Sequence, residues 1–497
     1  MKHQLSKSTF MRGVKCEKSL YLNKHKKELR DELTIQQQAI FSQGSKVGEL
    51  AQGLFPGGID LSPASFYDFG PSIEATSEAI KNQAPIIYEA AFLFDGVLAA
   101  MDILVKTEAG YSAYEVKSST EVKEVYLQDV ALQAYVIESC GVKLADISIV
   151  YINNQYVKNG PIDIKELFCV ESVVDQLQPF LVNVPQQINQ FRTVLASTTA
   201  PAIEIGMQCQ LPYACDFMEH CWKAVPEYSV FNLSRLSRKK CFELYRKGIV
   251  FLSEIPDNEE LNVNQRMQIE AEKNKEPIIK HNEIERFVDE LSYPIRHLDF
   301  ETFGLAIPLL NQCKPYQQVV FQYSIHTQQH PNERPAHFEF LAETSQQTDF
   351  RKELIEQLIK DCGDSGDILV YNISFEKAKL LDLAMAFPEY EASLRGIVSR
   401  LKDLMEPFMK RWYYLPEMKG SYSIKKVLPA IDPDFENAYQ ELEISDGASA
   451  NLIFGQILDG TFIEATESVR ENLLKYCELD TLAMVRILNK LNKLAYS

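Results

Sequence analysis

Two acidic side chains and a lysine lie on neighbouring strand-forming runs in the first half of the chain. The stretch IIYEAAFLFDGVLAAMDILVKTEAGYSAYEVKSS has turn signals at residues 95–96 and 108–110, which predict adjacent strands. Asp102 falls inside an apolar strand, and the two-residue period of the next strand places Glu115 and Lys117 on one face. Carboxylates are hard ligands for Mg²⁺ or Mn²⁺, and a lysine beside them can orient water and stabilise negative charge. The pattern predicts metal-assisted hydrolysis of a phosphodiester.

A second acidic group is spread over the last 200 residues. Asp299 and Glu301 in PIRHLDFETFGLAIP alternate on one face of a predicted strand. Like charges so close are unfavourable unless a cation lies between them. Tyr476 and Asp480 are four residues apart and therefore share one face of the last predicted helix. With Glu376 from DILVYNISFEKAKLLDLA, these residues predict a second cation site.

Four of the ten cysteines form a third group. Cys209, Cys215 and Cys221 lie in CQLPYACDFMEHCW with five residues between successive members, and Cys16 lies far upstream. The spacing lacks the C-x-x-C pairs of zinc ribbons and the short gaps of ferredoxins. Four thiolates are nevertheless enough for a metal centre, which would fasten the first helix to residues 209–221 and add to folding stability. Four unrelated cysteines are the alternative.

The elements that must position these residues alternate between strand and helix, which predicts an α/β or α+β fold. We expect an N-terminal helix, strands over 86–118, a helix over 121–140 and a strand over 145–153. Residues 226–290 are polar, charged and helix-prone, as in a helical connector. Strands begin again near residue 293, and the last 30 residues form an amphipathic helix.

Over residues 1–225 the motif order resembles the RecB-like branch of the PD-(D/E)XK nucleases. The resemblance implies a restriction-endonuclease-like core in which Asp102 and Glu115 bind metal and Lys117 is catalytic. It also implies that Cys16 and the three later cysteines ligate a [4Fe–4S] cluster, with Zn²⁺ as the alternative.

The same resemblance points to further residues. Glu49 in GSKVGELA matches the N-terminal acidic motif, and Gln133 and Tyr135 in DVALQAYV match the helix that carries Gln and Tyr. Glu89 in YEAAF is another candidate near the metal, with an edge-strand surface glutamate as the alternative interpretation.

Residues 291–497 resemble the DnaQ-like DEDD exonucleases of the RNase H superfamily, in the tyrosine variety. The resemblance implies an RNase H-like domain in which Asp299, Glu301, Glu376 and Asp480 hold two metal ions. Tyr476 would orient the attacking water, and nucleotides would leave from a 3′ end. Glu376 stands where aspartate is usual, so its longer side chain leaves open whether both metal positions are occupied.

Composition limits the function classes. The net charge of −18 is unusual for a nucleic-acid binder, but residues 1–30 carry nine Lys and Arg against two Glu, and residues 235–247 carry six against one. No apolar run could span a bilayer and the N-terminus has no apolar leader, so we expect a cytoplasmic protein without a membrane partner. An oxidoreductase would need a second cofactor motif, and G-x-G-x-x-G and P-loop sequences are both absent.

The leading hypothesis is a metal-dependent nuclease that hydrolyses DNA, as single strands or at ends, in repair, processing or defence. RNA remains open as a substrate, and protein partners do not follow from the sequence. The alternative hypothesis is a nucleic-acid-binding or assembly protein in which one or both sites have decayed.

Overall fold

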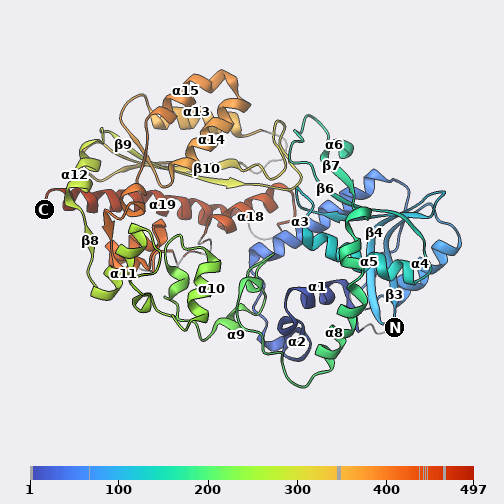
Figure 1. The fold of residues 1–497 in the computed structure, drawn as a ribbon. Helices are drawn as coiled ribbons and strands as arrows, with labels where there is room; N and C mark the ends of the chain where they lie inside the picture. The colour runs from blue at the N-terminus through green and yellow to red at the C-terminus, as the bar shows by residue number, and fades with distance from the viewer. Residues whose placement is uncertain are drawn as a thin grey trace. The chain divides into compact units, whose positions relative to one another are not determined.

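The computed structural model describes residues 4–65, 68–343, 349–435, 437–439, 442, 444, 446–462 and 466–497. The chain divides into two compact units, one of residues 1–224 and 306–316 and the other of residues 225–305 and 317–497. Strands and helices alternate in both units, so the fold is of the mixed α/β type that the sequence predicted (Figure 1). Of the helices in the described part of the chain, none combines the length and apolarity that crossing a membrane requires.

The first unit is built on a seven-stranded mixed sheet. Its strand order is β2-β3-β4-β5-β6-β7, and β1 pairs with β4. Strands β3, β4 and β5 are antiparallel neighbours joined by the two predicted turns, whereas β6 runs parallel to β5. The strands are β1 (Leu5–Ser6), β2 (Ile59–Asp60), β3 (Ile86–Phe94), β4 (Val97–Lys106), β5 (Tyr111–Lys117), β6 (Leu144–Ile152) and β7 (Phe168–Ser172).

Strand β5 has helices on both of its faces, α5 (Glu124–Ser139) on one and α3 (Ile35–Ala51) on the other. Tyr111 and Ala113 pack in the apolar core with α5, while Tyr114 and Val116 pack in the cluster that contains α3. This alternation confirms the predicted two-residue period and directs Glu115 towards α5. Helices α1 (Lys7–Lys15), α2 (Glu17–His25) and α8 (Val184–Ala196) complete the core on the α5 side.

Residues 306–316 follow a strand of the second unit in sequence but pack within the first unit. Ala306 lies in the apolar cluster beside α3. The backbone N–H of Lys158 donates to the carbonyl of Cys313 at 3.1 Å, and Tyr316 Oη donates to the carbonyl of Ser118 at 2.6 Å. The segment therefore ends beside the residue that follows Lys117.

The second unit contains a five-stranded sheet in the order β11-β10-β9-β12-β13. Strands β9, β10 and β11 form the predicted antiparallel meander, and β12 and β13 continue the sheet in parallel with β9. The strands are β9 (Ile295–Phe303), β10 (Val319–Gln328), β11 (Ala336–Leu341), β12 (Ile368–Val370) and β13 (Leu401–Asp403).

The two faces of this sheet differ in character. Leu298 and Phe300 of β9 point into an apolar core with helices α13 (Arg351–Cys362), α14 (Ile373–Ala386) and α15 (Glu391–Ser399). The opposite face is covered by α19 (Thr466–Ala495), the expected amphipathic helix, which runs along β9 and β10 (Figure 1). Side chains alternate along β9, so the positions next to Leu298 and Phe300 point to the opposite face of the sheet, which α19 covers.

Residues 225–290 contain the predicted helices and belong to the second unit. They form α10 (Arg238–Arg246), α11 (Val263–Asn274) and α12 (His281–Asp289). Leu244 of α10 and Ile269 of α11 share a small apolar cluster, so this segment has a core of its own.

Candidate metal-binding and catalytic sites

Glu115 is the centre of the first acidic cluster. Its Oε1 accepts from Lys7 Nζ at 2.8 Å and from Lys117 Nζ at 2.7 Å, and its Oε2 accepts from Gln133 Nε2 at 2.8 Å. Lys117 Nζ also donates to Asp129 Oδ2 at 2.6 Å. Glu115 is only 1% exposed, so these donors replace the water that would otherwise solvate its charge.

Asp102 lies beside Glu115, as the sequence predicted for adjacent strands. Its Oδ2 accepts from the backbone N–H of Val116 at 2.6 Å. Burial, and then the negative charge of Glu115, raise the pKa of Asp102 to about 8. Burial also opposes ionisation of Glu115, but Lys117 and Lys7 outweigh it and lower the pKa of Glu115 to about 2. Asp102 is therefore the carboxyl group here that most needs an additional positive charge to ionise.

Glu89 belongs to the same electrostatic cluster. Its neighbours Tyr88 and Ala90 pair with Ile103 and Met101, so Glu89 lies opposite Asp102 in the ladder. Its φ of +54° is in the left-handed region, a strained conformation for a residue within a strand. Burial raises the pKa of Glu89, the charge of Lys7 lowers it, and the charge of Glu115 raises it again.

The charges of this cluster are compatible with one divalent cation. Four carboxylates and two ammonium groups leave a formal charge of two negative. Asp129 Oδ1 and Gln133 Oε1 are buried, and neither accepts a hydrogen bond within the described part of the chain. Since buried acceptors normally have a partner, these oxygens and the excess negative charge fit a bound cation with its water. Lys7 and Asp129 were not predicted, although Asp129 precedes Gln133 by one helical turn.

Two further sequence candidates lie on α3 and α5 of this unit. Glu49 is exposed on α3. Tyr135 packs edge-on against Phe94, with ring centroids 6.1 Å apart. Since it is two residues from Gln133, it faces a different side of α5. Tyr126 is the aromatic residue near Lys117, with Nζ 5.3 Å from the ring centroid.

The second acidic cluster brings together residues from β9 and α19. Asp299, Glu301 and Asp480 each offer a carboxylate oxygen, and these oxygens lie within 4.8 Å of one another. Burial, and then the charge of Asp480, raise the pKa of Asp299 well above its usual range. Burial, and then the charge of Asp299, raise the pKa of Glu301 well above its usual range. This mutual repulsion is relieved by protons or by cations.

Glu376 joins this cluster from the first turn of α14. The start of α14 is held by Asp403, whose carboxylate accepts from the N–H groups of Asn372 and Ile373 at 3.2 and 3.3 Å. Burial, and then the charge of Asp299, raise the pKa of Glu376 to about 9. Its Oε2 is buried and accepts no hydrogen bond from the described residues. Glu376 is not among the residues whose oxygens lie within 4.8 Å of one another, but a buried, unpartnered carboxylate oxygen that feels the charge of Asp299 has the chemistry of a cation ligand.

Two tyrosines and a lysine complete the second cluster. Tyr439 Oη donates to Asp480 Oδ1 at 2.6 Å. Burial raises the pKa of Asp480, and the hydrogen bonds from Tyr439 and Tyr476 oppose this rise only in part. Lys425 Nζ lies 5.2 Å from the ring centroid of Tyr439 and 4.9 Å from that of Tyr476. A Cβ at Gly447 would lie 3.3 Å from Glu301 Oε2, so the backbone there approaches the carboxylate closely. Tyr439 and Lys425 were not predicted.

The four cysteines line one cavity, together with Ser19 and Phe217. Burial raises the pKa of Cys16, and the charges of Cys215 and Cys209 raise it further. Burial also raises the pKa of Cys221, and the charges of the same two cysteines raise it further. The sulfurs from the N-terminal helices and from residues 209–221 therefore face a common space.

Ion pairs and a hydrogen bond join the N-terminal segment that contains Cys16 to the segment of residues 209–221. Arg12 forms a bidentate ion pair with Asp216, with Nη2 to Oδ2 at 2.8 Å, and Arg30 Nε lies 2.6 Å from the same carboxylate. Asp31 Oδ2 accepts from the N–H of Met218 at 2.7 Å. The cysteines are thus held in place by the surrounding chain as well as by any group they bind.

The spread of the sulfurs bears on the kind of group they fit. A single tetrahedral Zn²⁺ with Zn–S bonds of about 2.3 Å requires sulfurs about 3.8 Å apart. Over the described residues, ligand atoms converge to within 4.8 Å in two groups, and neither group includes a cysteine. No three of these four sulfurs therefore lie as close together as the ligands of one tetrahedral Zn²⁺ ion would.

Comparison with known proteins finds a family match that includes part of the second cluster but not Tyr476 or Asp480. The family described as a domain of unknown function (DUF2779) matches residues 296–423, which hold Asp299, Glu301 and Glu376. The Uncharacterized protein MG366 of Mycoplasma genitalium is 31% identical over 206 residues, which cover 38% of this chain and 31% of that protein. The homolog of MG366 in Mycoplasma pneumoniae is 30% identical over 206 residues, with the same two shares. Uncharacterized protein UU173 of Ureaplasma parvum is 29% identical over 217 residues, or 38% of this chain and 30% of its own length. The chain thus spans about a third of the length of these relatives.

Proposed function

We propose that this protein is a metal-dependent nuclease with two hydrolytic sites, a RecB-like PD-(D/E)XK site in the first unit and a DEDD-type exonuclease site in the second. The proposal rests chiefly on the convergence of Asp299, Glu301 and Asp480, whose carboxylate oxygens lie within 4.8 Å although the residues are up to 181 positions apart. The grouping of Asp102, Glu115 and Lys117 in the first unit supports it independently.

At both sites a divalent cation would supply Lewis-acid stabilisation and a bound water of lowered pKa. In the first unit, Asp102, Glu115 and Glu89 would hold the cation, and Gln133 fixes the orientation of the Glu115 carboxylate. Lys117, held between Glu115 and Asp129, would hold the attacking water and stabilise charge on the phosphate.

In the second unit, the proposed ligands are Asp299, Glu301, Glu376 and Asp480. Tyr476 lies among these carboxylates, and burial and the charge of Asp480 keep its phenol protonated by raising its pKa. It can therefore donate one hydrogen bond and accept another, as orientation of a water molecule requires. Lys425 would stabilise a phosphate that approaches the acidic residues. We propose an exonuclease that acts from 3′ ends and belongs to the RNase H-like group.

An open pocket in the first unit suits an unpaired nucleotide. It has a volume of about 450 Å³ and lies between α1, α5 and residues 211–213. Leu211 and Tyr213 are 55% and 54% exposed, and Lys15 Nζ lies 4.2 Å from the Tyr213 ring centroid. An exposed aromatic ring with an adjacent cation is the arrangement on which bases stack in single-stranded nucleic acids. Since α1 also carries Lys7 and α5 carries Asp129, the pocket and the first site share two helices.

The same proposal assigns a [4Fe–4S] cluster to the four cysteines. Bound there, the cluster would join α2 to residues 209–221 and so hold α1, with Lys7, against the sheet. Its role would be to stabilise the first unit rather than to take part in hydrolysis.

The experiment that tests the proposed function uses the full chain, purified without oxygen, and single-stranded DNA and RNA labelled at the 5′ end. With Mg²⁺ or Mn²⁺ we expect degradation that chelation abolishes. Lys117→Ala and Asp299→Ala should each remove a different part of the product pattern, with stepwise 3′ shortening lost in Asp299→Ala. Product patterns identical to that of the wild type in both variants would contradict the proposal.

A further inference from the structure

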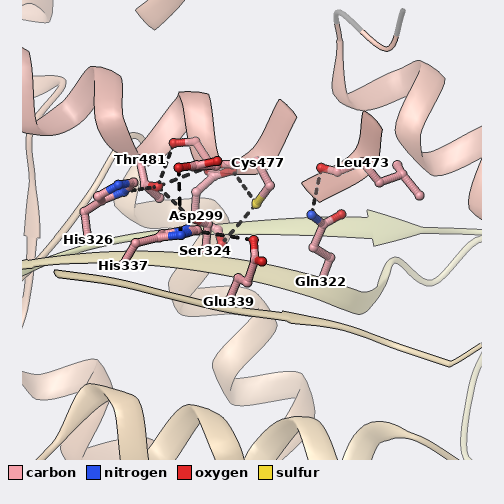
Figure 2. A network of polar contacts seen from close by, with 10 residues as sticks. Asp299, Gln322, Ser324, His326, His337, Glu339, Leu473, Cys477 and Thr481 are labelled. Carbon is pink, nitrogen blue, oxygen red and sulfur yellow. Dashed lines mark hydrogen bonds and ion pairs between the residues drawn. The ribbon is translucent and has the colours of Figure 1, made fainter. Parts of the chain in front are cut away.

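Beside the second acidic cluster, α19 covers a group of histidines that the proposed hydrolysis does not use. His326 on β10 and His337 on β11 are opposed residues of the ladder, and Ser324, two positions before His326, is opposed to Asp299 on β9. Opposed residues share a face of the sheet, so the histidines and Asp299 all face α19. Figure 2 shows the two imidazoles and Thr481 of α19 directed towards one another.

These histidines form a compact group with a carboxylate. One nitrogen of each imidazole and a carboxylate oxygen of Glu478 lie within 4.8 Å of one another. The two rings are stacked with centroids 4.5 Å apart, and His337 Nδ1 lies 3.9 Å from Glu478 Oε1. Two imidazoles and a carboxylate are ligands that first-row divalent metals prefer.

A chain of hydroxyl groups holds one nitrogen of each imidazole in place. Thr481 Oγ1 of α19 lies 2.7 Å from Ser324 Oγ and 2.8 Å from His326 Nδ1. It also lies 3.1 Å from the carbonyl oxygen of Glu478 in the same helix. Ser324 Oγ in turn lies 2.9 Å from His337 Nε2, so the two hydroxyl groups link the imidazoles.

These contacts engage Nδ1 of His326 and Nε2 of His337, so each imidazole is oriented through one nitrogen and can offer the other to a metal ion. His337 Nδ1 lies 3.9 Å from Glu478 Oε1, a separation at which one cation placed between the two atoms can bind both.

We propose that His326, His337 and Glu478 bind one first-row divalent metal ion, of which Zn²⁺ is the type that fits, at a site distinct from the acidic cluster. The metal joins α19 to strands β10 and β11. Since Glu478 and Thr481 flank Asp480, the metal also fixes the part of α19 that carries Asp480 and Tyr476. The site is structural and does not depend on the proposed nuclease activity.

Cobalt substitution tests this site with a spectroscopic readout. The full chain is stripped with a chelator, supplied with excess Mg²⁺ to occupy sites made of oxygen ligands, and titrated with Co²⁺. We expect one equivalent of Co²⁺ to give visible d–d absorption, and His337→Ala and Glu478→Gln each to weaken its binding by at least ten-fold. Both residues are partly exposed, so these variants are expected to fold.

Two matched variants serve as controls. Glu339 lies 4.0 Å from His337 Nε2, the nitrogen already bound to Ser324, so Glu339→Gln should keep the Co²⁺ spectrum. Asp299→Asn should keep it as well, even though it removes activity at the acidic cluster. Absence of visible absorption in the wild type, its full retention in His337→Ala, or its loss in Asp299→Asn would overturn the proposal. A near-ultraviolet thiolate band that disappears in Cys215→Ala would place the cobalt at the cysteines instead and would also overturn it.

Discussion

The phenol of Tyr439 donates a hydrogen bond of 2.6 Å to Oδ1 of Asp480, a carboxylate that also lies within 4.8 Å of Asp299 and Glu301. Tyr439 precedes Asp480 by 41 residues and is 8% exposed. Its hydroxyl therefore holds one oxygen of a buried carboxylate in place. Tyr476, by contrast, lies one helical turn before Asp480 on the same helix.

We expect Tyr439→Phe and Tyr476→Phe to affect activity in different ways. Loss of the Tyr439 hydroxyl should raise the Mn²⁺ concentration needed for half-maximal exonuclease activity by about 10- to 100-fold, because it orients a metal ligand. Loss of the Tyr476 hydroxyl should lower kcat at saturating Mn²⁺, because it orients water. Mn²⁺ titrations of both variants measure this, and the same kcat defect without a Mn²⁺ shift in Tyr439→Phe would contradict the assignment.

Removal of one negative charge from the second cluster should change thermal stability in a direction that depends on metal. In chelator, Asp299→Asn should stabilise the protein by on the order of 1 kcal/mol, because it relieves repulsion among buried carboxylates. In the wild type, Mn²⁺ at about 100 times its Kd should add about 2.7 kcal/mol, whereas the variant should gain far less. Thermal unfolding with and without Mn²⁺ measures both effects, and a variant that loses stability in chelator is the contrary result.

The cysteine cluster should contribute to the stability of the first unit. Cys215→Ala should lower the iron and sulfide content, abolish the brown colour of anaerobic protein and lower Tm, because ligand binding adds to the free energy of unfolding. Cys140 is exposed and lies outside the four-cysteine group, so Cys140→Ala is the matched control and should change none of these properties. Zinc in place of iron in the purified wild type would instead show that the four cysteines bind Zn²⁺.

Tyr213 should contribute to binding of single strands. Tyr213→Ala should weaken binding by about 1–3 kcal/mol, the usual contribution of one stacked base, with a larger effect on single-stranded than on duplex DNA. Phe41 on α3 is exposed to a similar degree, 60% against 54%, so Phe41→Ala controls for loss of an exposed ring. Fluorescence anisotropy with short oligonucleotides gives the affinities, and equal effects of the two substitutions would remove the reason to assign Tyr213 to substrate binding.

The sequence predicted those site residues whose common face follows from the side-chain repeat of one strand or one helix. The alternation along β5 placed Glu115 and Lys117 on one face, and the helical turn of α19 placed Tyr476 with Asp480. These predictions succeeded because the spacing of a strand or a helix fixes which side chains share a face. The meander that follows Asp299 was predictable for the same reason.

The repeat of a strand or a helix could not predict contacts between residues that lie far apart in the sequence. Lys7 contacts Glu115, which lies 108 positions away in the sequence. Tyr439, which donates to Asp480, lies in a stretch whose sequence shows neither a strand nor a helix repeat. The pairing of His326 with His337 depends on strand register, which the sequence leaves open until both strands are aligned. The packing of residues 306–316 in the first unit is likewise a long-range contact that no motif indicated.

The most direct test of two independent hydrolytic sites is the double variant Lys117→Ala/Asp299→Ala. Degradation of labelled single-stranded DNA with Mn²⁺ is measured for the wild type, both single variants and the double variant at equal concentration. We predict that each single variant keeps the activity of the other site and that the double variant falls to the level seen with chelator. A double variant as active as the wild type would contradict the account.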